Sequence, residues 1–325
     1  MTGCFKKSAT GLAKRSIAWK TVPSMEPMKH QENKGMKRVL VAGYGYIGSL
    51  VGHLLAEAGT EVVAVSRTIP GGLLRQPHPN VHWFPADLTC RDSLSGLKGD
   101  FDHALFAASS SRGGADDYRH IYCNGLDNLM TLLDGRLSQS FIYLSSTGVY
   151  GQNEGEWVDE TMPVQPKSET GQVLVEAEKR MIHRHQSNAF PGMILRLSGI
   201  YGPGRGYAWK RIQQGNAVIE APGERWVNMI HRDDAARAVL AAFMEGIAGE
   251  FYNVTDDVPV RQLEFYQWLA SASGSPIPKV VTSDPLKPSK RQVTHKRISN
   301  QKLKQLNNFK LKFPSFKEGY LDLMK

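Results

Sequence analysis

The sequence has little cysteine and no long apolar run. Its 325 residues include only three cysteines, Cys4, Cys90 and Cys123, which are too few for a disulfide framework and lack the spacing of a zinc site. No stretch reaches the roughly 18 apolar residues that a membrane helix needs. A P-loop and a G-x-S-x-G motif are also absent. These absences exclude a disulfide scaffold and a membrane-spanning protein, give no metal site, and indicate a reducing compartment.

Acidic residues are scarce at the two ends of the chain. The formal net charge is +9, and the basic excess lies in residues 1–35 and 279–325, whereas residues 36–278 are mildly acidic. The C-terminal segment is dominated by Lys, and a nucleic-acid surface would instead interleave Arg with aromatic residues on one face. We therefore expect a small-molecule partner, with no nucleic acid and no membrane. The composition, 41% hydrophobic and 22% charged, is that of a globular protein.

Residues 1–35 show no sustained apolar period, so we predict a disordered basic extension there. Its first 25 residues carry no acid, as in transit peptides, although Arg enrichment is weak. A second interpretation places the functional start at Met36, immediately before the first predicted strand. We expect a cytoplasmic protein, with an organelle as the alternative that the basic extension leaves open.

From Lys37 onward, short apolar runs alternate with segments of helical period. The apolar runs predict buried parallel strands at Arg38–Ala42, Glu61–Val65, His103–Ala108 and Phe141–Leu144. The helical segments are Ile47–Ala58, Asp116–Leu133, Gly171–His185, Asp233–Gly246 and Gln262–Ser273. This order predicts an α/β protein with a Rossmann-type doubly wound parallel sheet and a smaller C-terminal substrate lobe. We expect a dinucleotide-binding core over 36–165, and the remaining strands and the lobe over 166–325.

A glycine motif follows the first predicted strand and opens the first predicted helix. Gly43, Gly45 and Gly48 form a G-x-G-x-x-G segment, in which the glycines serve a tight turn, close approach to a pyrophosphate and close packing of helix on strand. The helix N-terminus offers free N–H groups to phosphate oxygens. We predict that the three glycines, together with Tyr46 and Ile47, bind a dinucleotide.

The end of the second predicted strand indicates which dinucleotide is bound. An NAD site usually places Asp or Glu there to bind the ribose 2′-hydroxyl. This strand ends instead with Ser66 and Arg67, which can hydrogen-bond and charge-pair a 2′-phosphate. We therefore predict NADP, with NAD as the alternative.

Several further segments occur in a characteristic order. They are Asp87-Leu88, Phe106-Ala107-Ala108, Leu144-Ser145-Ser146-Thr147-Gly148-Val149-Tyr150-Gly151, and the later Leu195–Arg205 and Asn228–Asp234 segments. In this order the sequence resembles the extended short-chain dehydrogenase/reductase superfamily, the NAD(P)-dependent epimerase/dehydratase group that acts on nucleotide sugars. The resemblance implies that Asp87 and Leu88 contact the adenine end of the cofactor and that Ala107 and Ala108 border it.

The resemblance also exposes a departure. The family's chemistry runs on a Ser or Thr, a Tyr and a Lys, which exchange a proton with the substrate hydroxyl while a hydride moves to or from the nicotinamide. Ser146 occupies the first position, but Thr170 stands where Tyr is expected and Leu174 where Lys is expected. A Thr hydroxyl is far too weak an acid to replace a tyrosinate, and Leu carries no charge.

A different acid would then be needed, and Tyr150, Tyr201 and Lys167 are the candidates. Our catalytic candidates are Ser146, to polarise a substrate oxygen, and Tyr150, as the replacement acid.

The predicted function is an NAD(P)-dependent oxidoreductase or epimerase/dehydratase acting on a sugar nucleotide or another hydroxyl or carbonyl compound. Arg196, Arg205 and Arg225 are the candidate donors to an anionic substrate. The alternative is a non-catalytic NADP(H)-binding sensor or regulatory protein that has lost its chemistry. A homodimer is compatible with either function.

Overall fold

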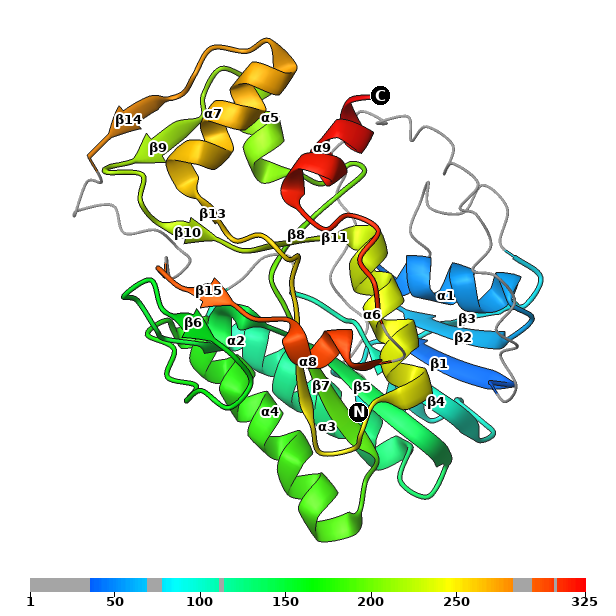
Figure 1. Cartoon of the computed structure of the whole chain (residues 1–325). Helices are drawn as coiled ribbons and strands as arrows, with labels where there is room; N and C mark the ends of the chain where they lie inside the picture. Colours follow the sequence, from blue (N-terminus) through cyan, green and yellow to red (C-terminus); the bar gives the residue numbers. More distant parts are fainter. Residues whose placement is uncertain (1–35, 69–77, 111–113, 283–293, 307–308) are drawn as a thin grey trace.

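The structure of the chain is a computed structural model that describes residues 36–68, 78–110, 114–282, 294–306 and 309–325. The extension expected over 1–35 lies outside the described residues. A sheet with helices on its two faces forms the larger part of the molecule, and a smaller lobe lies beyond one end of the strands (Figure 1).

The sheet has seven strands in the order β12-β7-β5-β4-β1-β2-β3, and all neighbouring strands pair in parallel. Their bounds are β1 Arg38–Ala42, β2 Glu61–Ser66, β3 Val81–Pro85, β4 Phe101–Phe106, β5 Leu137–Ser146, β7 Gly192–Leu197 and β12 Phe251–Val254. The chain leaves β1 toward β3 and then returns to the other side of β1 through β4. This order confirms the predicted doubly wound parallel sheet.

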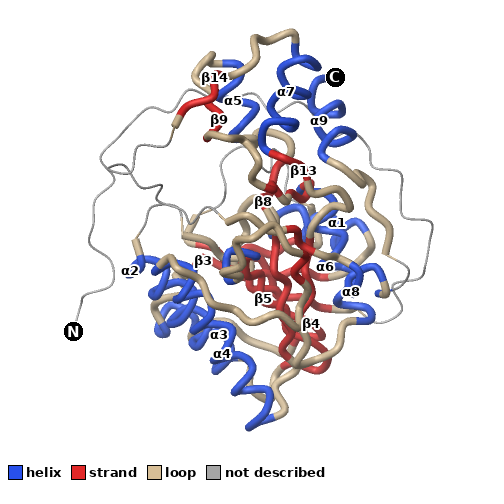
Figure 2. The backbone as a smooth tube through the Cα atoms, turned by 60° about the vertical axis from the view of Figure 1, so that its left-hand side comes forward, coloured by secondary structure: helices blue, strands red, loops and turns tan. Residues whose placement is uncertain are grey.

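Two helical layers cover the sheet (Figure 2). On one face lie α1 (Gly48–Glu57) and α6 (Arg232–Glu245), and on the other lie α3 (Leu126–Leu132) and α4 (Glu169–Asn188). Alternate residues of β1 enter the two cores, because successive side chains of a strand point to opposite faces. Both faces are therefore buried, which explains the continuous apolar runs in the strand sequences.

The helix expected over Asp116–Leu133 is divided into three pieces. A short α2 (Ala115–Tyr118) leads into a π-helical segment, η2 (Arg119–Gly125), and then into α3. A π-turn inserts an extra residue into a helix and changes the directions of the side chains around it. The other predicted helices are observed within three residues of their expected ends.

The smaller lobe is built mainly from the second half of the chain. Its elements are α5 (Tyr207–Gln213), β9 (Val218–Glu220), β10 (Trp226–Val227), β13 (Val260–Arg261), α7 (Gln262–Ser273), β14 (Lys279–Val281) and α9 (Phe316–Met324). All of these elements except β14 contribute to a separate apolar core around Phe265 and Phe316. Two parallel pairs lie between lobe and sheet: β8 (Gly199–Tyr201) with β11 (Met229–His231), and β6 (Trp157–Val158) with β15 (Arg297–Ile298).

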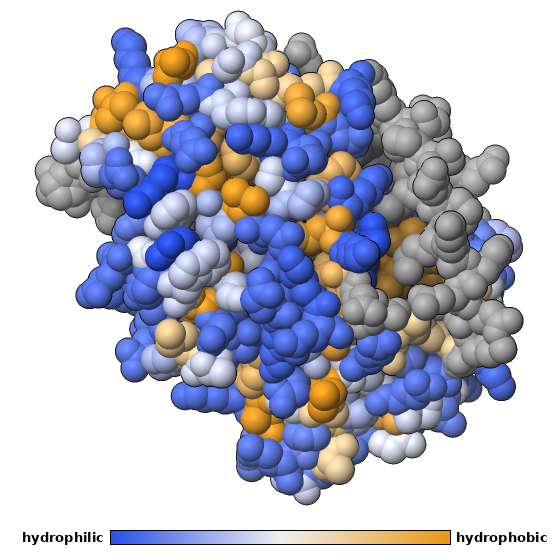
Figure 3. Space-filling model, in the orientation of Figure 1, coloured by the Kyte–Doolittle hydropathy of each residue, from blue (hydrophilic) through white to orange (hydrophobic). Residues whose placement is uncertain are grey.

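The remaining elements are short: η1 (Arg91–Leu94), η3 (Thr147–Val149) and α8 (Gln301–Lys304). Among the described residues no helix is both long enough and apolar enough to span a membrane. The face drawn in Figure 3 is mostly hydrophilic, with apolar side chains gathered over the part of the lobe that contains β14. Val280 and Val281 are exposed there.

Candidate cofactor and active site

The glycine motif forms the turn between β1 and α1. Gly43 has φ +95°, and a Cβ added to it would lie 2.2 Å from the backbone nitrogen of Ala108. A Cβ on Gly48 would lie 2.2 Å from the carbonyl oxygen of Gly43, so both positions require glycine. A Cβ on Gly45 would meet nothing within 4 Å. Gly45 thus borders an open space at the N-terminus of α1, as the close approach of a pyrophosphate requires.

The neighbouring strand ends place the other predicted cofactor residues at the same edge of the sheet. The Ala107 N–H donates to the Ala42 carbonyl at 2.7 Å, which holds the end of β4 beside the glycine turn. After β3, the Asp87 carboxylate accepts hydrogen bonds from the backbone N–H and the hydroxyl of Thr89, at 2.9 and 2.8 Å. Leu88 is buried against Gly125. The carboxyl ends of parallel strands are where α/β sheets bind ligands.

The end of β2 carries no acidic side chain. Arg67 is exposed, and the Ser66 hydroxyl donates to the Thr68 carbonyl at 3.0 Å. The same hydroxyl accepts a hydrogen bond from the indole nitrogen of Trp83, whose side chain is 40% exposed on the edge strand β3. An exposed guanidinium and an exposed indole therefore lie at the corner where the adenosine half of a dinucleotide would bind.

Tyr46 connects the glycine turn to the loop that follows β8. Its phenol donates to the Pro203 carbonyl at 3.1 Å, and its ring lies 5.2 Å from the guanidinium carbon of Arg205 and 5.3 Å from that of Arg232. Arg232 is paired with Asp233 at 3.1 Å. Arg205 is exposed and pairs with no carboxylate among the described residues. Of the three predicted substrate arginines, Arg205 is the one that lies beside the cofactor turn.

The expected Tyr and Lys positions lie at the start of α4. Leu174 is 6% exposed and belongs to the core between α3, α4 and the sheet. Thr170 precedes Gly171, whose Cβ position lies 3.3 Å from the Gly148 carbonyl, so the start of α4 contacts η3. Ser146 lies just before η3 and is half-buried, and its hydroxyl accepts a hydrogen bond from the Gly148 N–H at 3.1 Å. Ser146 is therefore close to the missing pair.

Tyr150 lies inside the molecule rather than at the edge of the site. Its side chain is fully buried, its phenol donates to Asn253 Oδ1 at 2.9 Å, and it accepts a hydrogen bond from Arg196 Nη1 at 2.8 Å. Burial raises the pKa of Tyr150, and the charge of Arg196 opposes this rise. These contacts give Tyr150 a structural position, and the replacement-acid role finds no support in them.

Each of the three side-chain nitrogens of Arg196 also has a partner inside the protein. Its Nε and Nη2 donate to the two carboxylate oxygens of Glu178 at 3.1 and 2.7 Å, and both side chains are at most 4% exposed. The Ser145 hydroxyl donates to the same carboxylate at 2.6 Å. The substrate role predicted for Arg196 finds no support in these contacts. Arg225 lies apart in the lobe near Tyr266, and burial lowers its pKa.

Sequence reasoning missed two groups near the site. Lys296 lies in the basic C-terminal segment, yet it is 3% exposed and its ammonium donates to the Tyr150 carbonyl at 2.9 Å. Tyr122 lies in the π-helical segment, whose geometry no local pattern indicates. Among the described residues, no cluster of three or more His, Cys, Asp or Glu side chains is arranged to hold a metal ion.

Comparison with known proteins identifies relatives of the chain. The protein YeeZ of Escherichia coli K12 is 28% identical over 244 residues, which are 74% of this chain and 85% of YeeZ. A dTDP-glucose 4,6-dehydratase of Actinoplanes is 26% identical over 272 residues, which are 75% of this chain and 84% of that enzyme. Among solved structures, dTDP-glucose 4,6-dehydratase of Bacillus anthracis in complex with NAD has a TM-score of 0.75 at 18% identity, covering 88% of this chain and 94% of that one.

These relatives have the fold that the structure shows, and a family model also matches most of the chain. The model of the NAD dependent epimerase/dehydratase family matches residues 39–255, from β1 to the loop after β12. The match includes the glycine turn, both edge strands of the sheet and the Ser146 segment. The family to which the chain belongs is therefore the NAD dependent epimerase/dehydratase family, as its sequence motifs predicted.

Proposed function

We propose that this protein binds a nicotinamide dinucleotide at the glycine turn and uses it to oxidise or reduce a carbon–oxygen centre of a sugar nucleotide. The observation that carries the proposal is the glycine turn itself: Gly43 and Gly48 are packed against backbone, while Gly45 borders open space. The cofactor would supply the hydride acceptor or donor. The chain's own residues would bind it, orient the substrate and move the proton.

The choice between the two dinucleotides rests on the end of β2. Arg67 is exposed beside Ser66, with Trp83 next to it, and no carboxylate is present there to accept the ribose 2′-hydroxyl. A guanidinium pairs well with a phosphate dianion, whereas it gains little from a hydroxyl. We therefore propose NADP as the preferred cofactor, although the Bacillus anthracis relative was solved with NAD.

The substrate class is inferred from the charge beside the cofactor turn and from the relatives. Arg205 is an exposed guanidinium with no carboxylate partner in the described part of the chain, and it lies over the ring of Tyr46. A nucleoside diphosphate group would satisfy it through charge-assisted hydrogen bonds. The Actinoplanes relative is a dTDP-glucose dehydratase, which is an enzyme of that substrate class.

Ser146 is the proposed hydrogen-bond donor to the reacting oxygen. Its hydroxyl is half-buried at the carboxyl end of β5, and it accepts from the Gly148 N–H, which leaves its own proton free for an acceptor in the site. A donor held in this way stabilises negative charge that develops on a substrate oxygen.

Cofactor binding provides the first test. The variant Gly45→Val places a side chain in the open space without meeting protein atoms near its Cβ, so we expect normal stability but at least about tenfold weaker binding of NADPH. Gly96→Ala is the matched control, because its Cβ would make only ordinary contacts with Phe84, at 3.5 and 3.6 Å. NADPH fluorescence measures the binding affinity, and thermal unfolding measures the stability. Equal affinity in wild type and Gly45→Val would refute the site.

One observation favours a second candidate function. Leu174 is packed into the core, so the lysine that usually binds the nicotinamide ribose has no polar substitute at its own position. A non-catalytic NADP(H) sensor would tolerate this loss. It would bind NADPH tightly yet form no product from dTDP-glucose, UDP-glucose or a carbonyl panel with either the oxidised or the reduced cofactor, whereas the enzyme would convert at least one of them. Product is followed by chromatography, because a dehydratase or epimerase regenerates its nicotinamide and leaves the absorbance unchanged.

A further inference from the structure

The π-helical segment η2, which carries Tyr122, packs against the start of α4, where the expected catalytic pair is missing. Cys123 Sγ lies 3.9 Å from the Val173 carbonyl, and Arg119 forms an ion pair with Glu176. The turn that carries Tyr122 therefore packs on the turn of α4 that carries Leu174. Tyr122 and Leu174 belong to the same buried cluster. The helical turn of Tyr122 thus faces the part of α4 from which the usual ammonium is absent.

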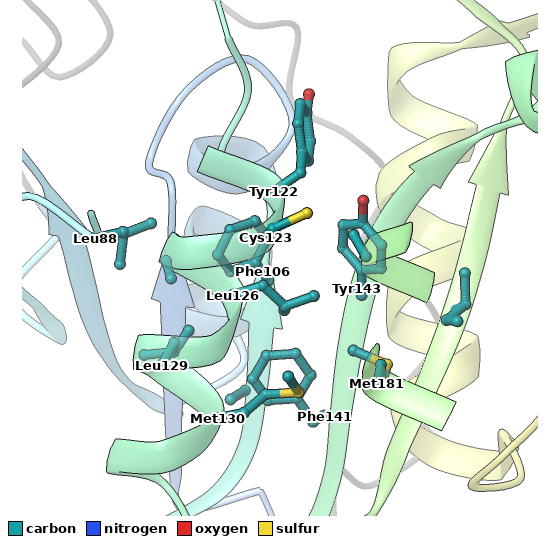
Figure 4. Close-up of a cluster of buried hydrophobic side chains, with 14 of the residues drawn as sticks. Leu88, Phe106, Tyr122, Cys123, Leu126, Leu129, Met130, Phe141, Tyr143 and Met181 are labelled. Carbon is teal, nitrogen blue, oxygen red and sulfur yellow. The ribbon is translucent and has the colours of Figure 1, made fainter. Parts of the chain in front are cut away.

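The phenol of Tyr122 points toward the ligand-binding edge of the sheet. In Figure 4 its oxygen extends in the direction of the strand arrowheads, beyond the ring of Phe106 at the end of β4. Its side chain sits in the rim of the core with 9% of the residue exposed. Because β4 runs into Ala107 and Ala108, which meet the glycine turn, the phenol lies at the cofactor end of the site.

The surroundings of Tyr122 keep its phenol in the protonated form. Burial raises its pKa to about 12, while a backbone hydrogen bond from Ser110 and the positive charge of Arg205 act in the opposite direction. The phenol is therefore protonated at neutral pH, and a cation is placed to stabilise the phenoxide when the proton leaves. Ser110 follows Ala108 closely, so Tyr122 lies near the loop that borders the cofactor.

Four other phenols of the described residues are occupied or enclosed. Tyr150 is held by Asn253 and Arg196, and the phenol of Tyr46 donates to the Pro203 carbonyl. Tyr143 is completely buried. Tyr201 is buried in the lobe and stacks on Tyr320 with ring centres 4.7 Å apart. The phenol of Tyr122 has no hydrogen bond to a side chain of the described residues and points to the ligand-binding edge.

From this geometry we infer that Tyr122 exchanges the proton with the substrate oxygen, in place of the tyrosine absent at position 170; this rests on the proposed function. In the reducing direction, the carbonyl carbon receives the hydride that the reduced cofactor supplies. The carbonyl oxygen takes the phenol proton, so C–H and O–H bonds replace the C=O π bond. The Tyr122 phenoxide then regains a proton from water. In the oxidising direction the Tyr122 phenol first gives its proton to water, and the phenoxide then takes the proton of the substrate hydroxyl while the carbon gives its hydride to the oxidised cofactor.

The first experiment needs no turnover. The full chain is prepared with tyrosine labelled with ¹³C at Cζ, and the Tyr122 and Tyr118 signals are assigned with the variants Tyr122→Phe and Tyr118→Phe. Tyr118 is the control because it lies one turn earlier with its ring centre 5.0 Å from that of Tyr122. We expect saturating NADP⁺ and NADPH to shift the Tyr122 signal by different amounts, because only the oxidised nicotinamide is cationic, and to shift the Tyr118 signal less.

Two different failures can be told apart. If NADP⁺ and NADPH bind but leave the Tyr122 signal unmoved, the proton-transfer role is wrong while the proposed function stands. If neither NADP(H) nor NAD(H) binds the wild-type chain, the proposed function fails and the role of Tyr122 fails with it.

The second experiment uses whichever of dTDP-glucose and UDP-glucose the wild-type protein turns over. We expect Tyr122→Phe to lower kcat by at least about 100-fold, the usual contribution of a positioned acid, with NADPH affinity within about twofold of wild type. Tyr118→Phe should keep wild-type kcat. The variant Tyr122→Phe retains the ring and its packing, so a wild-type kcat in this variant would overturn the inference.

Discussion

The ion pair between Arg196 and Glu178 should stabilise the fold rather than bind a substrate. Arg196 donates to both carboxylate oxygens of Glu178 and to the phenol of Tyr150, and its guanidinium carbon lies 4.3 Å from the ring centre of Phe251. Both charged side chains are at most 4% exposed. Removing one partner therefore leaves a buried charge without compensation, which typically costs about 3–5 kcal/mol.

Three variants separate the contributions of this pair. Glu178→Leu removes both acceptor oxygens and should lower the free energy of unfolding by the upper part of that range. Glu178→Gln retains one acceptor for Arg196 and should cost the lower part. The double variant Glu178→Leu/Arg196→Met removes both charges, so it should be more stable than Glu178→Leu alone, since apolar replacement of a whole buried pair is often close to neutral.

The assay is urea unfolding followed by circular dichroism and tryptophan fluorescence, with the m-value checked for constancy. NADPH and sugar-nucleotide affinities are measured on the same variants. The reasoning is refuted if Arg196→Met loses less than about 1 kcal/mol of stability and instead weakens sugar-nucleotide binding at least about tenfold. That result would instead support the substrate-binding role predicted for Arg196.

Three further predictions concern single ionisable side chains. Arg67→Ala should weaken NADP⁺ binding at least about tenfold and leave NAD⁺ binding nearly unchanged, which calorimetry with both dinucleotides would reveal; an unchanged NADP⁺ constant contradicts the 2′-phosphate role. Burial lowers the pKa of Lys296 from 10.5 to about 8, so the folded chain loses this proton at a lower pH than the unfolded chain does. As pH rises from 8 to 10.5, the free energy of unfolding of the wild type should therefore increase by up to about 3 kcal/mol relative to that of Lys296→Met. If the difference in unfolding free energy between the two proteins stays constant over that range, the Lys296 ammonium is solvated and the prediction is wrong. Burial likewise lowers the pKa of His103 from 6.5 to about 4, so stability should fall on acidification across this window, and His103→Gln should lose about 3 kcal/mol less than wild type; parallel acid curves would refute this.

The sheet was predictable because its strands are buried on both faces. A parallel strand between two helical layers needs apolar side chains on both sides, so β1 appears in the sequence as an uninterrupted apolar run between glycines. The strands β3, β7 and β12 were not predicted. In the edge strand β3, His82 and Trp83 are exposed, so its sequence lacks that pattern. The glycine turn was predictable because backbone contacts at Gly43 and Gly48 permit no side chain.

The catalytic half of the site was harder to predict because its residues come from distant segments. Motif position marked Tyr150 and Arg196, but position within a motif does not reveal burial, and both side chains form hydrogen bonds inside the protein. Lys296 was counted with a solvated basic segment, although it reaches the Tyr150 carbonyl from far along the chain. The π-turn around Tyr122 reorients side chains without any local sequence signal.

The strand order of the sheet means that the cofactor-binding part cannot be cut out of the chain as a continuous piece. The edge strand β12 is formed by residues 251–254, although β1 begins at Arg38, and β7 must be in place before β12 can join the sheet. On a ribosome, β5 is therefore synthesised with one backbone edge unpaired until β7 emerges. A fragment ending near residue 165 would keep that edge exposed and would lack Asn253, the partner of Tyr150. We expect such a fragment to aggregate through β5, as unprotected strand edges do.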